Sequence, residues 1–175
     1  LPIFVSPVDG TIMDHGIVEN NLLIQAKRHR YPVSELLREK SEIVEVTKQY
    51  FITIYLAPTD YHRIHCPYGG LISSTSHIGK SLFSVNKKAQ TNIPYLYIRN
   101  ERAVMKIESS LVSYSLVSVG ASIVGSIVPF WSDPGSKTRK DYVNEWNIGP
   151  LEAKKHALKG QELAHFRMGS TVILI

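Results

Sequence analysis

Residues 109–132, SSLVSYSLVSVGASIVGSIVPFWS, carry no charged side chain, and they decide between two classes of fold. An uncharged run of this length is typical of a membrane-spanning helix. This run, however, contains eight serines, two glycines and a proline, which is a poor composition for a helix in hydrocarbon. Its many β-branched residues favour strands instead. The segment therefore predicts strands of a β-rich fold, and no part of the chain is expected to span a bilayer.

Other stretches repeat this strand pattern. Runs of aromatic and β-branched side chains alternate with glycine, proline, asparagine and serine, as strands and their turns do. Further strands are expected within residues 46–57, 69–79, 103–120, 121–128, 141–147 and 171–175. Together they predict a mainly-β fold (β-rich α+β), a compact barrel or sandwich of many short strands with one or two short helices.

The first forty residues contain two expected turns and the best helix candidate. Turns between short strands are expected at residues 14–16, Asp-His-Gly, and at residues 20–21, Asn-Asn. A helix is expected within residues 31–40, YPVSELLREK, with Ser34 as its N-cap and its two leucines facing inward.

The length and composition indicate one globular domain. The chain has 175 residues, of which 43% are hydrophobic and 20% charged, as in an ordinary soluble protein. We therefore expect a single domain over residues 1–175. Residues 130–143, FWSDPGSKTRKDYV, are the best candidate for a flexible loop. The single cysteine, Cys66, excludes an internal disulfide and a multi-cysteine metal site, and no metal is expected.

The charge balance is basic. The net charge is +5 and the pI about 9.3, with basic clusters at residues 27–30, 137–140 and 154–155. Such a balance suits nucleic acid or an anionic membrane surface, while any single cluster also fits an ordinary solvated surface. No RNA-binding signature or zinc-finger spacing is present, so nucleic acid is not an expected partner.

Residues 167–172, RMGSTV, place a glycine carbonyl directly before a serine hydroxyl at the start of the last expected strand. Glycine and serine suit an ordinary turn there. The alternative is that the Gly169–Ser170 peptide bond is made to break. Asp9, His62 and His65 lie in other segments and are candidate partners. Their spacing does not choose between the two readings, because a catalytic triad is recognised by geometry rather than by sequence position.

Six ordered motifs favour the second reading. PVDGTI, TDYHRIHCP, LFSVN, IRNERAV, VGASIVGSI and KGQELAHFRMGSTVI follow one another from about residue 6 to the chain end. In this order they resemble the phosphatidylserine decarboxylase family, whose hallmark is a Leu-Gly-Ser-Thr site of self-cleavage. Met168 stands here in place of the leucine, a conservative apolar change. The resemblance is weakest through residues 129–143.

The resemblance implies that the chain makes its own electrophile. Decarboxylation of an amino acid requires a carbonyl that captures the amine and accepts the electrons left when carbon dioxide departs. In this family the serine hydroxyl, here that of Ser170, attacks the preceding carbonyl, here that of Gly169, and the resulting ester breaks by elimination. Residue 170 then becomes an N-terminal pyruvoyl group, the expected covalent cofactor. The expected reaction converts phosphatidylserine to phosphatidylethanolamine.

Residue roles follow from the matching motifs. His65 matches the base that activates the serine hydroxyl, and Asp9 matches the aspartate that orients this base. His62 matches the position expected for the proton donor in decarboxylation, and its alternative is a structural histidine bonded to the backbone. Phe83 and Asn86 are candidate substrate contacts, and the alternative for both is a packed strand end.

The resemblance also implies partners and a location. Residues 1–169 would be the β-chain part and residues 170–175 the start of the α-chain part, in a chain expected to be truncated at both ends. The protein is expected at the cytoplasmic face of the cytoplasmic membrane, as a peripheral protein on an anionic surface and as a homodimer. Two other readings stay open. One is a pyruvoyl-dependent decarboxylase of another seryl lipid or an amino acid, and the other is a non-catalytic lipid-binding β-barrel.

Overall fold

The computed structural model describes residues 3–25, 29–39, 48–78, 81–122, 127–129, 155–166 and 170–175. Outside these residues lie the predicted loop at residues 130–143, the predicted strand at residues 141–147, the basic cluster at residues 137–140 and Gly169 of the predicted cleavage site.

The described residues form mostly strands. These are β1 (Thr11–Ile17), β2 (Leu22–Gln25), β3 (His29–Pro32), β4 (Tyr50–Leu56), β5 (Arg63–His65), β6 (Gly70–Ile78), β7 (Arg102–Glu108), β8 (Ser113–Val119), β9 (Ile127–Pro129), β10 (Lys155–Ala157), β11 (Glu162–Phe166) and β12 (Ser170–Leu174). The helices in this part of the chain are α1 (Val33–Leu37), α2 (Lys87–Asn92) and α3 (Leu96–Arg99). The mainly-β class is confirmed, while α2 and α3 lie where the sequence pattern predicted no element.

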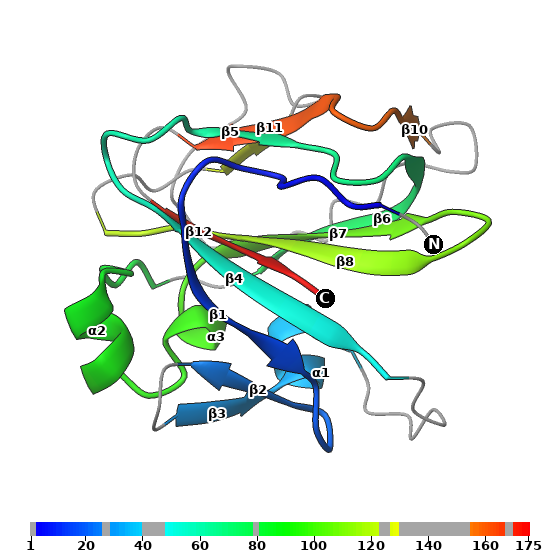
Figure 1. The fold of residues 1–175 in the computed structure, drawn as a ribbon. Helices are drawn as coiled ribbons and strands as arrows, with labels where there is room; N and C mark the ends of the chain where they lie inside the picture. Colours follow the sequence, from blue (N-terminus) through cyan, green and yellow to red (C-terminus); the bar gives the residue numbers. More distant parts are fainter. Residues whose placement is uncertain are drawn as a thin grey trace.

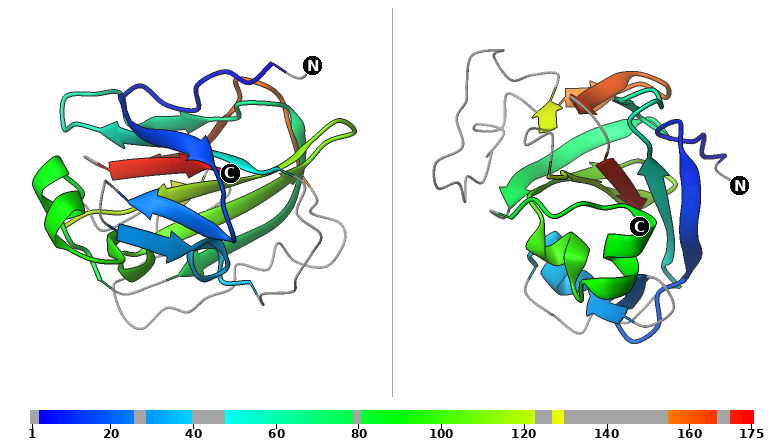
Figure 2. Two further views of the ribbon diagram at one scale, coloured as in Figure 1. Left: turned by 60° about the horizontal axis from the view of Figure 1, so that its bottom comes forward. Right: turned by 90° about the vertical axis from the view of Figure 1, so that its left-hand side faces the viewer.

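The elements are arranged in layers, as Figures 1 and 2 show. The middle layer is a seven-stranded antiparallel sheet in the order β1-β4-β12-β8-β7-β6-β10. The three-stranded sheet β5-β11-β9 covers one face of it. The helices and the β2-β3 hairpin cover the other face. The arrangement is a layered sandwich, one of the two predicted architectures.

Each face of the middle sheet has its own hydrophobic core. Leu56 and Val172 point toward the three-stranded sheet and pack with Phe166, while Ile173 points toward the helices and packs in the core that contains Tyr97. A strand buried on both faces is apolar at nearly every position. This explains why β8, which lies between β12 and β7, carries no charge. No helix in the described part of the chain is long and apolar enough to cross a bilayer.

One of the two predicted turns is wrong. Residues 14–16 do not turn but continue β1, which pairs with β4 from Thr11 to Ile17 around a bulge between Ile12 and Asp14. Pairing with the long strand β4 overrides the turn preference of Asp-His-Gly. The turn at Asn20 and Asn21 is confirmed, with φ values of 51° and 61° that asparagine tolerates better than most residues.

The predicted helix forms as α1, but its start differs from the prediction. Pro32 is the N-cap and makes no side-chain cap bond, because the proline ring has no polar atom that could accept one. Ser34 lies inside the helix, where its hydroxyl accepts a hydrogen bond from Asn21 Nδ2 at 3.0 Å. Leu36 and Leu37 are buried, as predicted.

Asn100 joins three of the sequence motifs at one point. Its Oδ1 accepts from the backbone N–H of Phe83 at 2.9 Å, and its Nδ2 donates to the carbonyls of Phe83 at 2.8 Å and Gly120 at 2.9 Å. The side chain is fully buried. The motifs LFSVN, IRNERAV and VGASIVGSI are therefore held together by one amide.

Candidate active site

Ser170 is the first residue of β12, inside the middle sheet. It pairs with Leu56 of β4 and is fully buried. Because alternate residues of a strand face the same way, its Oγ points with Val172 toward the core under the three-stranded sheet. This Oγ has no hydrogen-bond partner among the described residues. A buried hydroxyl without a partner costs free energy, and such a group in a native protein calls for an explanation.

Gly169 lies outside the described residues, so only its neighbours in the chain are placed. Phe166 ends β11 in the three-stranded sheet, and Ser170 begins β12 in the middle sheet. The chain therefore passes from one layer to the other at the predicted cleavage point.

His62 is held against the chain that leads to Ser170. Its carbonyl accepts from the backbone N–H of Phe166 at 2.9 Å, and Leu56 pairs with Ser170. The segment from Leu56 to His62 therefore contacts the described residues on both sides of the predicted cleavage point, Phe166 and Ser170. In Figure 1, β4 ends, β5 begins and β12 begins on the same side of the molecule.

The ring of His62 has one engaged nitrogen and one without a partner. Nδ1 bonds the carbonyl of Asp60, which fixes the hydrogen on Nδ1 because a carbonyl only accepts. Asp60 is itself held in place, since its Oδ2 accepts from the N–H of Ala57 at 2.8 Å. Nε2 is buried and has no partner among the described residues. His62 therefore combines the backbone bond of a structural histidine with a nitrogen that can accept a proton.

His65 faces the other way. Its neighbours Ile64 and Cys66 point into the core, so the His65 ring lies on the outer face of the three-stranded sheet. Nδ1 bonds the carbonyl of Gly160 at 2.8 Å, and Nε2 bonds the hydroxyl of Tyr61 at 2.9 Å. The Tyr61 ring also stacks on the imidazole, with ring centroids 5.7 Å apart. Neither Tyr61 nor the Gly160 carbonyl was predicted from the sequence to contact His65, although the tyrosine stands in the same motif as both histidines.

Asp9 lies in the loop before β1. This loop contacts both the three-stranded sheet and the middle sheet. On the first side, the Pro7 carbonyl accepts from the N–H of His65 in β5 at 2.8 Å. A Cβ on Gly10 would lie 2.4 Å from the carbonyl oxygen of Tyr55 in β4, so this position requires glycine. The Asp9 side chain is exposed and is not a partner of the His65 ring nitrogens. The structure brings the loop to β5 without the carboxylate–imidazole contact that the resemblance implies.

Phe83 and Asn86 lie on the helix-covered side of the middle sheet, opposite to the side that the Ser170 hydroxyl faces. Asn86 caps α2, since its Oδ1 accepts from the N–H of Ala89 at 2.9 Å. Phe83 packs against the core under the helices, and the guanidinium of Arg99 lies 4.4 Å from its ring centroid. Both residues have architectural contacts, and their contact with substrate stays a prediction.

The remaining polar residues near β5 form surface or structural contacts. Arg63 pairs with Glu162 at 2.6 Å on the outer face of the three-stranded sheet, an exposed pair of small energetic value. The buried Cys66 bonds the carbonyl of Tyr68 at 3.2 Å. Within the described ranges, no group of three or more histidine, cysteine or acidic residues is arranged to hold a metal ion.

Comparisons with known proteins cover nearly the whole chain. A model of the family described as phosphatidylserine decarboxylase matches residues 2–175. The chain is 39% identical to the phosphatidylserine decarboxylase proenzyme of Hamiltonella defensa, over 98% of this chain and 60% of that protein. It is 37% identical to the proenzyme of Klebsiella pneumoniae (98% and 54%) and 40% identical to that of Idiomarina loihiensis (96% and 58%). The chain thus spans 54% to 60% of the length of these relatives.

Proposed function

The chain belongs to the phosphatidylserine decarboxylase family, and from this premise we propose that it carries the self-cleaving site of an enzyme that converts phosphatidylserine to phosphatidylethanolamine. The observation that carries the proposal is the buried hydroxyl of Ser170, which has no partner among the described residues and directly follows a glycine. A nucleophile that must lose its proton to a nearby base suits such a position.

In the proposed self-cleavage, Ser170 Oγ attacks the carbonyl carbon of Gly169 and gives up its proton to a base. The peptide C–N bond breaks, the freed nitrogen takes a proton, and an ester joins the two residues. A base then takes the α-proton of residue 170, the bond between Cβ of residue 170 and the ester oxygen breaks, and Gly169 is released as a carboxylate. The dehydroalanine left at position 170 adds water and loses ammonia. The pyruvoyl group formed in this way supplies the carbonyl that takes up the substrate amine and accepts electrons as carbon dioxide leaves.

The surroundings of residue 170 fit such a group. The ladder between β12 and β4 runs from Ser170 to Leu174, so a break before Ser170 interrupts none of its pairs. Residue 170 would stay paired with β4, and the rest of β12 would stay between β4 and β8. The apolar neighbours of residue 170, Leu56 and Val172, are fully buried and would keep water from the reacting carbonyl.

The two histidines take different roles in this proposal. We assign the base of self-cleavage to His65, oriented by Asp9, because both match the family motif. In the structure the His65 ring is engaged by Tyr61 and Gly160, so this role requires the ring to exchange those partners. We assign proton donation during decarboxylation to His62, because the Asp60 carbonyl keeps one hydrogen on Nδ1 and leaves the buried Nε2 to take up and return a second.

Intact mass measurement of the purified protein tests the proposal. Two fragments are expected, the smaller one beginning with a blocked residue that is lighter than serine by one ammonia. Ser170→Ala should give one uncut chain that releases no carbon dioxide. Ser118→Ala is the matched control, because Ser118 is also a fully buried serine of the middle sheet without a described partner, and it should be cut normally. A single unbroken wild-type chain that decarboxylates its lipid would refute the proposal.

The histidine roles have their own test. His65→Ala should stay uncut, and Asp9→Ala should be cut slowly. His62→Ala should be cut but decarboxylate about 100-fold to 10,000-fold more slowly, the usual range for loss of an acid–base group. If His62→Ala stays uncut while His65→Ala is cut, the two assignments must be exchanged.

We also propose that the protein acts as a peripheral membrane protein at the cytoplasmic face, as a homodimer whose cleaved chains stay together. The interior position of β12 supports the last point, and the net charge of +5 suits an anionic surface. Release of carbon dioxide from phosphatidylserine vesicles, compared with free serine, separates a lipid substrate from a soluble one.

A further inference from the structure

Residues 81–100 form a basic surface on the same side of the molecule as the start of β12. They contain Lys87, Lys88 and Arg99 and no acidic residue. All three side chains are exposed, the lysines on α2 and the arginine at the end of α3. None of the three forms an ion pair with a residue of the described ranges. We call these three residues, together with Tyr95 between the helices, the basic face.

The basic face also carries aromatic groups. Tyr95 is 49% exposed at the tip between α2 and α3, with a φ of 56°. The guanidinium of Arg99 lies over the ring of Phe83, a cation–π contact that holds the charge in place. Tyrosine is enriched where proteins meet the boundary between water and lipid. Cations that have no ion-pair partner in the described part of the chain, next to an exposed tyrosine, match the chemistry of a phospholipid headgroup layer.

Tyr97 links α3, which carries Arg99, to β12. It lies in α3, is buried, and its hydroxyl lies near that of Thr171, which follows Ser170 in β12. Burial chiefly raises the pKa of this tyrosine, and the Asp14 carboxylate raises it further, whereas Thr171 acts in the opposite direction. Figure 1 and the left view of Figure 2 both show β12 beginning on the side where α2 lies. The basic face and the start of β12 therefore lie at the same end of the molecule.

We infer that the basic face is the surface through which this protein meets the anionic headgroups of a phospholipid membrane. This role rests on the proposed function, in which the substrate is phosphatidylserine, a lipid whose headgroup carries both a phosphate and a carboxylate. Membrane binding is therefore expected to depend on where a positive charge lies on the surface, and not only on the net charge.

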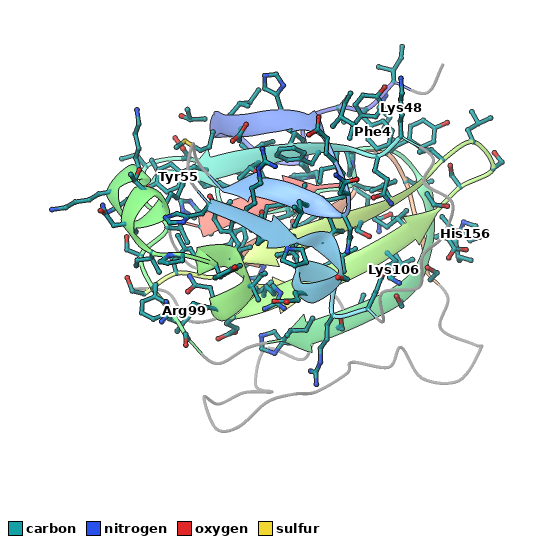
Figure 3. All side chains as sticks on the ribbon, turned by 90° about the horizontal axis from the view of Figure 1, so that it is seen from below. Phe4, Lys48, Tyr55, Arg99, Lys106 and His156 are labelled. Atoms are coloured by element: carbon teal, nitrogen blue, oxygen red, sulfur yellow. The ribbon has the colours of Figure 1, made fainter. Side chains whose placement is uncertain are left out.

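Lys88→Glu and Lys48→Glu form a matched pair for the test. Both lysines are exposed and both changes alter the net charge equally, but Lys48 lies just before β4. In Figure 3, Lys48 and Arg99 are labelled on opposite sides of the molecule. The Ser170→Ala background prevents turnover of lipid, so only binding is measured. The assay is cosedimentation with vesicles of phosphatidylglycerol and phosphatidylcholine, and with phosphatidylcholine alone.

We expect Lys88→Glu to weaken binding to the anionic vesicles by about five-fold or more, since each basic residue at such a surface contributes about 1 kcal/mol. Lys48→Glu should bind like its parent. Tyr95→Asn, which suits the left-handed backbone at this position, should also weaken binding while the protein stays folded. Equal weakening by the two lysine variants, or equal binding to neutral and anionic vesicles, would overturn the inference. Release of carbon dioxide from soluble short-chain phosphatidylserine by the unaltered protein tests the proposed function separately.

Discussion

At the scale of single residues, the two histidines of the motif TDYHRIHCP differ in what their rings contact. His65 has both nitrogens engaged, whereas Nε2 of His62 is buried and without a described partner. If His65 is the base of self-cleavage, the hydroxyl of Tyr61 occupies the nitrogen that must accept the proton. Tyr61→Phe keeps the stacked ring but removes a hydrogen bond of about 0.5–1.5 kcal/mol, so self-cleavage should become about 2-fold to 10-fold faster. The measurement is the rate at which the cut fragments appear after synthesis. Slower cleavage would mean that Tyr61 orients the base instead of restraining it.

At the scale of elements, Arg102 at the start of β7 joins two helices to the middle sheet. Its guanidinium is buried and donates to the carbonyls of Glu35 and Leu36 in α1, at 2.9 Å and 2.7 Å, and to that of Ile98 in α3, at 2.6 Å. Burial lowers the pKa of this guanidinium to about 10, with a smaller effect of the nearby Arg38 cation in the same direction, so it stays charged at neutral pH. Arg102→Met should cost about 2–4 kcal/mol, because buried carbonyls are left without donors. Urea denaturation measures this loss of stability. Arg102→Lys keeps the charge but not the forked geometry, so its free energy of unfolding should lie between those of the wild type and Arg102→Met. Equal stability of the methionine variant and the wild type would refute this role.

At the scale of the whole molecule, buried tyrosines set an alkaline limit on stability. Burial raises the pKa of Tyr31 and of Tyr97, and the Asp14 carboxylate contributes to both shifts. A tyrosine whose folded pKa is raised stays neutral in the native state but ionises in the unfolded chain at its ordinary pKa of about 10. Stability is therefore fully present below about pH 10 and is lost as the pH rises above it. Thermal unfolding followed by circular dichroism between about pH 8 and 11 should show this fall, and Tyr31→Phe should flatten it. A wild-type midpoint that does not change over this range would contradict the prediction.

Much of the fold was predictable because it depends on local pattern. The apolar runs of β4, β7 and β8 and the closing strand β12 are visible as aromatic and β-branched stretches, since a strand buried on both faces needs such residues throughout. The predictions that failed concern segments where tertiary contacts outweigh the local pattern. Asp14 to Gly16 carries a turn signal, but pairing with β4 recruits it into β1. No pattern marks the short helices α2 and α3, whose position depends on contacts such as the Asn100 amide.

The sequence by itself determined the family, the mainly-β class and the candidate residues, because ordered motifs and strand patterns are properties of the chain alone. The tertiary structure decided which way those residues face. Ser170 and Thr171 are neighbours, yet they point into different cores, and His62 and His65 share a motif, yet only His62 has a buried nitrogen without a described partner. The reason is that a strand turns successive side chains to opposite faces, so what each side chain meets depends on the layers that the rest of the chain packs against the sheet.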